Sequence, residues 1–284
     1  EVREKEIERK AGVEKTAGFF LMLFIVAGTF AVVYGILYVA NLIHPVLRFC
    51  LETFFIYQIF ATKSLKTESM KVYKKLKEGD LIGARKEVSY LVGRDTENLD
   101  ESEVAKADVE TIAENTADGV IAPMLFIAIG GAPLGFAYKA VNTLDSMVAY
   151  KNEELINIGF FSAKMDDICN FIPARFAAVM LMIASLILRF DFKGAVKIFK
   201  RDRFAHLSPN SAQTEAVAAG ALQIQLGGTH NYFGKAVVKP TIGDDIRPVE
   251  YEDIKRTNQL LYVSAVLSMA VCCLITFLIY VQLF

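Results

Sequence analysis

Carboxylates, amides and cations gather in four short stretches between residues 93 and 175. The stretches are Gly93 to Thr96, Ala113 to Gly119, Lys139 to Met147 and Asp166 to Arg175. Each lies beside a strongly apolar segment, and uncompensated charges are costly in a lipid environment. The pattern therefore predicts chemistry on a polar ligand at a membrane rather than a passive anchor.

The pair Asp166 and Asp167 is the clearest candidate for a metal site. Asn170 lies four and three residues further on, so on a helix both carboxylates and the amide approach one oxygen-liganded Mg²⁺. Arg175 follows Pro173 and is placed to clamp a phosphate. Paired acids also occur as partners of a helix N-terminal dipole, and this alternative stays open.

Residues 101 to 118 are expected to form a helix with one acidic face. At about 100° per residue, the apolar side chains fall on one stripe. The apolar stripe consists of Ala105, Val109, Ile112 and Ala113. The opposite arc of the helix consists of the polar residues Glu110, Thr111, Glu114, Asn115 and Asp118. No lysine lies in that arc, so it is predicted to hold a cation; the alternative is a polar face that meets water.

A second helix, from Lys139 to Tyr150, is expected to repeat this division. Ala140, Val141, Leu144, Met147 and Val148 share one side, and Lys139, Asn142, Thr143, Asp145, Ser146 and Tyr150 share the other. A polar face that directly follows an apolar segment is not expected to point at lipid tails. It indicates either a ligand site or a hydrogen-bonded seam between helices.

The segment from Arg201 to Gly234 is predicted to hold a turn and a tightly packed helix. Ser208-Pro209-Asn210 is typical of a turn, and the small residues Ala216 to Ala221 suit a helix that begins near Ser211 or Thr214. The free N–H groups at such a helix start suit an anion. Gly227-Gly228 is interpreted as a further turn, and the chain has no Walker-type phosphate loop.

The elements that must position these residues are membrane helices. Since 54% of the chain is hydrophobic while 22% is charged, the apolar residues must be concentrated in blocks. Ala17 to Ile43 and Leu260 to Phe284 each exceed the roughly 20 residues that cross a bilayer. Three weaker segments are Val46 to Ala61, Gly119 to Tyr138 and Phe176 to Leu188, and each is interpreted as a short span, a re-entrant hairpin or a buried helix.

The expected fold is therefore all-α, a polytopic helical bundle with up to five membrane segments. Gly130-Gly131-Ala132-Pro133 predicts a break between two half-helices, so at least one segment is broken or re-entrant. Residues 1–284 are expected to form a single membrane-embedded catalytic domain. A helical pair is predicted over residues 62 to 90, interrupted at Gly79-Asp80.

Lysine and arginine crowd into residues 1–15, 63–94 and 193–256, which places these regions in the cytoplasm by the positive-inside rule. Residues 62–118 and 191–256 are accordingly expected to be cytoplasmic. The polar stretches are expected to converge near the inner surface, although an outer location for residues 142–170 stays open.

The four cysteines and three histidines do not predict a disulfide framework or a histidine metal site. Both sets are scattered along the chain, and Cys272 and Cys273 are adjacent within an apolar helix. Ala17 to Ile43 is too long for the core of a cleavable signal peptide. Residue 1 is Glu rather than Met, so the natural chain is expected to extend further.

Several long blocks resemble the membrane-bound adenosylcobinamide-phosphate synthase (CbiB/CobD) family of cobalamin biosynthesis. The blocks are residues 92–99, 110–123, 130–133, 138–152, 166–175 and 206–210, from Val-Gly-Arg-Asp-Thr-Glu-Asn-Leu to His-Leu-Ser-Pro-Asn. They follow the family's order and are spread over residues 92–210, a little under half of the chain. At its start the chain lacks the family's initial apolar helix and the Asp-Pro and His-Pro-Val elements that follow it; His44-Pro45-Val46 looks similar but follows the first long apolar segment and is not equated with that element. The chain also differs at Ala149 and Gln213-Thr214.

The resemblance implies a ligase of the cytoplasmic membrane that depends on ATP and Mg²⁺ and has its active site toward the cytoplasm. Its substrates would be adenosylcobyric acid, a corrinoid, and either aminopropanol or aminopropanol O-phosphate, joined as an amide. Lipid is an expected partner, a homo-oligomer is an open possibility, and nucleic acid is not expected.

Roles for the individual residues are assigned as hypotheses. Mg²⁺ ligands are Asp166, Asp167, Asn170, Asp118 and Glu114; phosphates are neutralised by Arg94, Lys139, Lys151 and Arg175; the remaining cofactor contacts are Asp95, Thr96, Asn115, Asn142, Thr143, Ser146, Ser208 and Asn210. The base that deprotonates the amine is Glu215, Asp145 or His206, with Lys139 grouped among the catalytic residues.

Two other classes of protein stay open at this point. An Mg²⁺-dependent membrane prenyltransferase normally carries two acidic motifs, and only Asp166-Asp167-Asn170 qualifies here. A small-molecule transporter would use the break at Gly130 to Pro133, but the chain shows no internal repeat.

Overall fold

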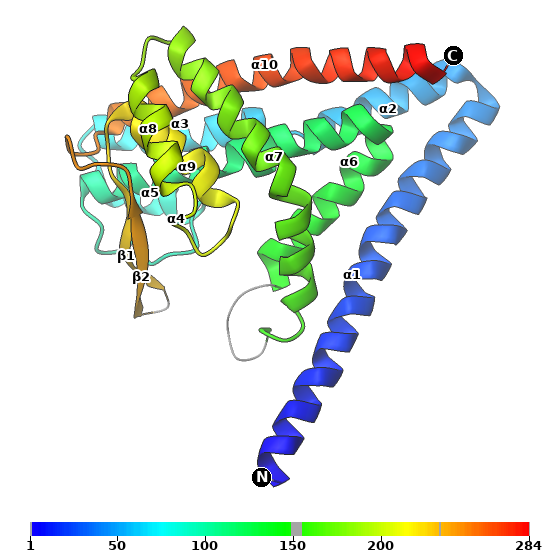
Figure 1. Cartoon of the computed structure of the whole chain (residues 1–284), viewed down its shortest axis with the longest axis horizontal. Coiled ribbons are helices and arrows are strands. Elements are labelled where there is room, and N and C mark those ends of the chain that lie inside the picture. The colour runs from blue at the N-terminus through cyan, green and yellow to red at the C-terminus, as the bar shows by residue number, and fades with distance from the viewer. Residues whose placement is uncertain (1, 149–154, 233, 284) are drawn as a thin grey trace. The chain divides into compact units, whose positions relative to one another are not determined.

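The computed structural model describes residues 2–148, 155–232 and 234–283. Its helices are α1 Val2–Ile43, α2 Pro45–Ile59, α3 Thr62–Lys77, α4 Leu81–Ser89, α5 Glu101–Asn115, α6 Ala122–Val148, α7 Phe160–Ile187, α8 Phe192–Asp202, α9 Ser211–Leu222 and α10 Tyr251–Leu283. A π-helical turn, Thr116–Ile121, joins α5 to α6, and strands β1 Leu226–Tyr232 and β2 Lys235–Ile242 form a hairpin (Figure 1).

Four of these helical segments are long and apolar enough to cross a membrane. They are Lys10–Ile43, Glu101–Val148, Phe160–Ile187 and Tyr251–Ile279. The predicted helical membrane fold is confirmed, since the segments include most of both firmly predicted spans and of two weaker ones. Val46 to Ala61 is not among them, because its helix α2 has only 15 residues.

The chain divides into two compact units. The first comprises Glu1–Phe60, Pro123–Asn170 and Cys273–Phe284, and the second comprises Ala61–Ala122 and Phe171–Cys272. Helices α7 and α10 therefore contribute to both.

In the first unit, α1 and α2 meet at a sharp bend at His44 (Figure 1). The ring nitrogen Nδ1 of His44 accepts a hydrogen bond from the backbone N–H of Val46 at 3.1 Å and so caps α2. Pro45 occupies the first helical position, where its missing N–H costs nothing.

The predicted break in α6 is confirmed. Gly130 has φ −137° and ψ 20°, and Gly131 has φ 65° and ψ −163°, so neither residue is helical. A methyl group at Gly131 would lie 2.6 Å from Oε1 of Glu52. That oxygen also accepts a hydrogen bond from the N–H of Ala132 at 3.4 Å. One of the free backbone N–H groups at the start of the second half-helix therefore has an acceptor.

In the second unit, the predicted helical pair is confirmed as α3 and α4. Gly79 adopts φ 74° between them, and Asp80 caps α4 by accepting a hydrogen bond from the N–H of Gly83 at 2.9 Å. Helix α9 begins at Ser211 as predicted, and all its residues are buried. A methyl group at Gly220 would lie 2.4 Å from the carbonyl oxygen of Gly194, so α8 and α9 pack backbone to backbone.

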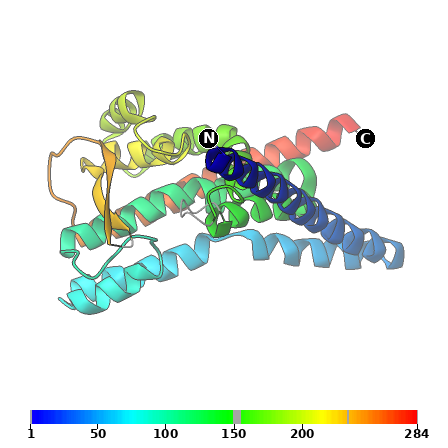
Figure 2. The same ribbon diagram turned by 90° about the horizontal axis from the view of Figure 1, so that it is seen from below.

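The β-hairpin was not predicted from the sequence. It lies beside α5, which β1 contacts (Figures 1 and 2). The interpretation of Gly227-Gly228 as a turn was wrong, because both glycines belong to β1 and the register shifts between Gly227 and Thr229. Gly227 has φ 74°, and a methyl group there would lie 2.3 Å from the carbonyl oxygen of Pro240.

Candidate functional site

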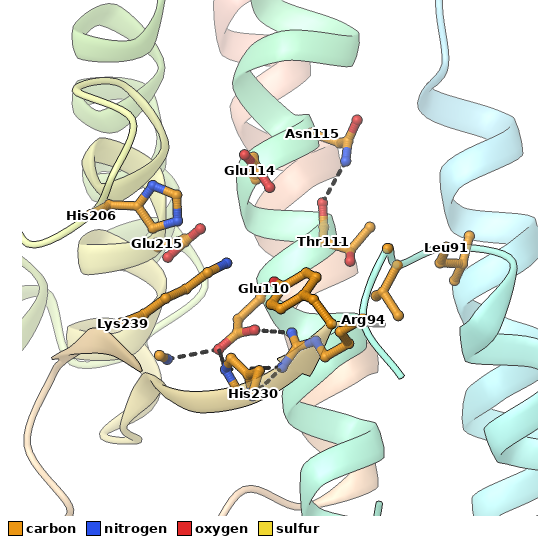
Figure 3. A pocket seen from close by; sticks show the side chains of 14 residues that line it. Leu91, Arg94, Glu110, Thr111, Glu114, Asn115, His206, Glu215, His230 and Lys239 are labelled. Carbon is orange, nitrogen blue, oxygen red and sulfur yellow. Dashed lines mark hydrogen bonds and ion pairs between the residues drawn. The ribbon is translucent and has the colours of Figure 1, made fainter. Parts of the chain in front are cut away.

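A polar cavity of about 180 Å³ lies within the second unit. It is enclosed by the loop that follows α4, by α5, by the loop before α9, by α9 itself and by the hairpin. Its ionisable and amide side chains are Arg94, Glu110, Glu114, Asn115, His206, Glu215, His230 and Lys239 (Figure 3). Five segments that are distant in the sequence thus bring charged groups of both signs to one small space.

Arg94 is held in the cavity wall by two partners. Its Nη2 donates to Oε2 of Glu110, and its Nη1 lies 2.9 Å from Nδ1 of His230 (Figure 3). Oε1 of Glu110 accepts a hydrogen bond from the N–H of Gly227 at 2.7 Å. The side chains of Arg94 and Glu110 are only 7% and 12% exposed, so this is a nearly buried ion pair that ties α5 to the hairpin.

The acidic face predicted on α5 lines the cavity. Glu110, Thr111, Glu114 and Asn115 all border it, whereas the predicted apolar stripe is buried. Oε1 of Glu114 accepts a hydrogen bond from the hydroxyl of Ser211 at 2.7 Å. Glu114 forms no ion pair with any residue that the structure describes.

Glu215 is a buried acid on α9 that also borders the cavity, with 4% exposure. Burial raises the pKa of Glu215 well above its usual range, and the negative charges of Glu114 and Glu110 raise it further. Lys239 and Arg94 oppose this effect. Glu215 therefore keeps its proton over a wider pH range than an exposed glutamate.

His206 faces Glu215 across the cavity (Figure 3). Its Nδ1 accepts a hydrogen bond from the N–H of Ser208 at 3.0 Å, so the neutral ring carries its proton on Nε2. Burial lowers the pKa of His206, which favours that neutral form. His206 is thereby prepared to donate a hydrogen bond from Nε2.

The other predicted site residues of the second unit lie outside the cavity wall. Asp95 accepts a hydrogen bond from the N–H of Gly234 at 2.8 Å, and Arg175 donates to Oδ1 of Asn210 at 3.3 Å. Thr96 is buried, Ser208 holds the loop before α9, and Asp118 lies in the π-helical turn.

The first unit contains the remaining predicted residues. These are Lys139, Asn142, Thr143, Asp145 and Ser146 on α6 and Asp166, Asp167 and Asn170 on α7. Tyr138 donates to Oδ1 of Asn170 at 2.8 Å, and Asn170 donates to Oδ2 of Asp166 at 3.0 Å. Thr143 and Ser146 are exposed. Lys151 and Tyr150 lie outside the described residues.

The shared metal site of Asp166, Asp167 and Asn170 stays a prediction. Asn170 binds Asp166, while Asp167 lies 3.7 Å from the ammonium of Lys164. Among the residues that the structure describes, no three His, Cys, Asp or Glu side chains are grouped to hold a metal ion. The convergence of the residues of both units in one chamber stays a prediction.

Three acidic or basic side chains of the cavity, those of Glu110, His230 and Lys239, were not predicted as site residues. Glu110 belongs to the acidic arc of α5, so the helical period already marked it. His230 and Lys239 had no such signal, because only the hairpin brings them back to α5 and their positions in the chain show no spacing rule.

The four candidate spans define a helical integral membrane protein, and its second unit holds a polar cavity lined by ionisable side chains. The family model described as CobD/Cbib protein matches residues 1–261 of the chain. The chain belongs to this family. No solved structure matches it.

Related proteins are similar over most of the chain. "Cobalamin biosynthesis protein CobD" of Clostridium perfringens (strain 13 / Type A) is 55% identical over 261 residues, which cover 92% of this chain and 83% of the relative. "Cobalamin biosynthesis protein CobD" of Streptococcus sanguinis (strain SK36) is 53% identical, with 87% and 78% covered. "Cobalamin biosynthesis protein CbiB" of Salmonella choleraesuis (strain SC-B67) is 46% identical, with 90% and 80% covered.

Proposed function

We propose that the protein acts in cobalamin biosynthesis as an ATP-dependent amide ligase. It joins a propionate of adenosylcobyric acid to the amine of aminopropanol or of its O-phosphate. The observation that carries the proposal is the cavity, where carboxylates and cations face one another in a chain whose relatives are named for cobalamin biosynthesis.

The reaction needs both kinds of charge. A carboxylate is a poor acyl donor at neutral pH, so its oxygen must become part of a leaving group before an amine can displace it. When bound, Mg²⁺ and ATP supply the phosphoryl group for this activation. Arg94 and Lys239 are the cavity cations that attract phosphate oxygens, and the fixed guanidinium of Arg94 favours a defined orientation.

The donor set fits Mg²⁺. Glu114 and Glu215 border the cavity without forming an ion pair among the described residues, and each repels the other's charge. Mg²⁺ is usually held by one or two carboxylates, with waters and substrate phosphates as the other ligands, so a cluster of three acids is not required. Glu114 and Glu215 would hold the ion, and Asp166 and Asp167 remain candidates from the first unit.

The amine must lose a proton as it attacks. A carboxylate that holds the ion is a weak base, so Glu215 suits this role only when Glu114 alone holds the ion and only after its own proton has left. His206 presents an N–H to the cavity in its neutral form, which suits binding a developing oxyanion better than accepting a proton. Glu215 and Asp145 stay open as bases.

Product formation by the purified protein tests the proposal. The protein is incubated with adenosylcobyric acid, ATP, Mg²⁺ and either form of the amine, and the corrinoid mass is measured. We expect the mass of the amide in complete mixtures and none without ATP. Product that forms equally without ATP, or no product with either amine, would contradict the ligase, and comparison of the two amines identifies the substrate.

Glu114→Gln provides the matched test of the cavity. The amide keeps the size of the side chain but removes the charge that would hold Mg²⁺. We expect the rate to fall about 100-fold, as for loss of one preorganised electrostatic contact. Glu68→Gln, which alters an exposed acid of α3, serves as the control and should leave the rate unchanged.

A further inference from the structure

Several arginines of the second unit form no ion pair among the described residues, and Arg175 and Arg203 are two of them. Arg175 lies on α7 and Arg203 directly follows α8. Neither forms an ion pair with any residue in the ranges 2–148, 155–232 and 234–283, and Nε of Arg203 is buried without a hydrogen-bond partner there. Because a guanidinium is always charged and presents planar donors, such groups suit the binding of an anion.

Hydrogen bonds tie both arginines to the same loop, which runs from Arg203 to Asn210. Nη1 of Arg175 donates to Oδ1 of Asn210 at 3.3 Å. Nε2 of Gln213 donates to the backbone carbonyl oxygen of Arg203 at 2.8 Å and to that of Pro209 at 3.2 Å. These two hydrogen bonds connect the two ends of the loop that precedes Asn210.

Aromatic rings fix both groups further. The guanidinium carbon of Arg175 lies 3.6 Å from the ring centre of Phe171, and that of Arg203 lies 4.8 Å from the ring centre of Phe204. Stacking covers the faces of a guanidinium and leaves its N–H donors in the plane, where they suit the oxygens of a phosphate. Neither arginine borders the cavity around Glu114 and Glu215.

The surroundings of the pair are apolar and open. Phe171, Ile172, Phe204 and Leu207 are 52%, 73%, 63% and 61% exposed. Phe171 and Ile172 lie in the candidate membrane span Phe160–Ile187. The ligand is thus expected to carry an apolar body beside its anionic group.

The helix that follows the span strengthens this expectation. Lys193, Lys197 and Lys200 of α8 are exposed. Basic clusters immediately after a membrane helix attract anionic lipid surfaces, at about 1 kcal/mol for each cation.

We propose that Arg175 and Arg203 bind the phosphate of an anionic phospholipid, whose acyl chains lie against the exposed apolar side chains. Asn210 positions Arg175, and the lysines of α8 add attraction that does not depend on geometry. The site is separate from the proposed ligase cavity, and its test does not depend on ligase activity.

Lipid binding to the purified full chain in detergent tests the proposal. Phosphatidylglycerol and phosphatidylcholine are titrated in parallel, and bound lipid is counted by native mass spectrometry. We expect phosphatidylglycerol to bind more tightly. The double variant Arg175→Gln/Arg203→Gln should bind it at least about tenfold more weakly, because charge-assisted hydrogen bonds are lost.

The variant Lys193→Gln/Lys200→Gln loses the same number of charges and is the matched control. It should keep most of the affinity for phosphatidylglycerol; an equal loss in both double variants would show diffuse attraction and overturn the site. Arg203→Lys keeps the charge without the planar donors, so it should also weaken binding, and it guards against misfolding of the double variant. Displacement of the lipid by millimolar inorganic phosphate or ATP would overturn the lipid assignment in favour of a soluble phosphate.

Discussion

At the scale of single residues, the cavity depends on groups that are charged or neutral for identifiable reasons. Glu110 is nearly buried and satisfied by Arg94 and by the N–H of Gly227. Glu215 is buried without such a partner among the described residues, and burial raises its pKa, so its proton is retained more readily. Two glutamates on the same cavity therefore differ in charge because of their hydrogen bonds and neighbours.

Arg94→Met should destabilise the fold. The change leaves the Glu110 carboxylate nearly buried without its cation, which costs about 3 kcal/mol in comparable pairs. Thermal unfolding in detergent measures the effect. Lys71→Met breaks the exposed pair with Glu68 and should change the melting temperature little. Equal effects of the two substitutions would show that the Arg94 pair is not structural.

His230 should make stability depend on pH. Burial and the charge of Arg94 lower the pKa of His230 from 6.5 to about 4, against an opposing effect of Glu110. Between these two pH values the unfolded chain binds a proton that the folded chain does not, so stability falls as the pH falls through this window. Above it, the contribution is fully present.

Thermal unfolding of the wild-type protein and of His230→Gln at pH 7 and pH 5 checks this prediction. The wild type should lose about 4 °C more than the variant between these conditions. The glutamine keeps a hydrogen-bond acceptor near Arg94 but does not titrate. Parallel losses in the two proteins would remove His230 as the source of the pH dependence.

At the scale of elements, two glycines and an acid define the break in α6. Gly131 adopts a left-handed φ of 65°, and Glu52 of α2 accepts a hydrogen bond from the N–H that follows. Arg48 lies 3.6 Å from Glu52, so the acid is partly neutralised beside apolar helices. The break is thus supported by partners rather than left open to lipid.

Gly131→Ala should destabilise the protein by about 1 to 2 kcal/mol from backbone conformation alone, and by more if Glu52 cannot move. Gly28→Ala in α1 is the control, because a methyl group there meets nothing within 4 Å and alanine favours a helix. The measurement is thermal unfolding in detergent. Gly131→Ala/Glu52→Ala shows how much of the loss comes from the contact, and an unchanged melting temperature for Gly131→Ala would contradict the break.

At the scale of the whole molecule, the open question is whether the acids of both units serve one reaction. Glu114 belongs to the second unit, and Asp167 belongs to the first. The sequence predicts that both reach the same metal-loaded chamber. Mutations within one catalytic assembly are not additive, so kinetics can test the prediction without further coordinates.

Asp167→Asn and Glu114→Gln should each reduce ligation by about 100-fold, and the double variant should be little worse than either. Rates come from the corrinoid mass assay, with helical circular dichroism as the check on folding. Losses that multiply in the double variant would indicate two independent roles. An unaltered rate for Asp167→Asn would remove that residue from the metal hypothesis.

Much of the fold was predictable because it follows from local chemistry. The length of the apolar segments predicted the central part of the four candidate spans. Gly130-Gly131 predicted the break in α6, and the helical period predicted the acidic face of α5. The failures were also physical. Helix α2 is too short for a membrane span. The hairpin depends on pairing between two strands, and the spacing of residues along the chain does not predict such pairing.

The sequence by itself determined that this is a helical membrane protein of one family and that α5 presents acids along one side, since hydropathy, helical period and family motifs are properties of neighbouring residues. Only the tertiary structure decided which distant groups meet them. His230 and Lys239 reach the cavity through the hairpin, and Glu215 becomes a buried acid because α9 is enclosed on all sides. Partner choice and pKa depend on three-dimensional surroundings, which the order of residues alone does not reveal.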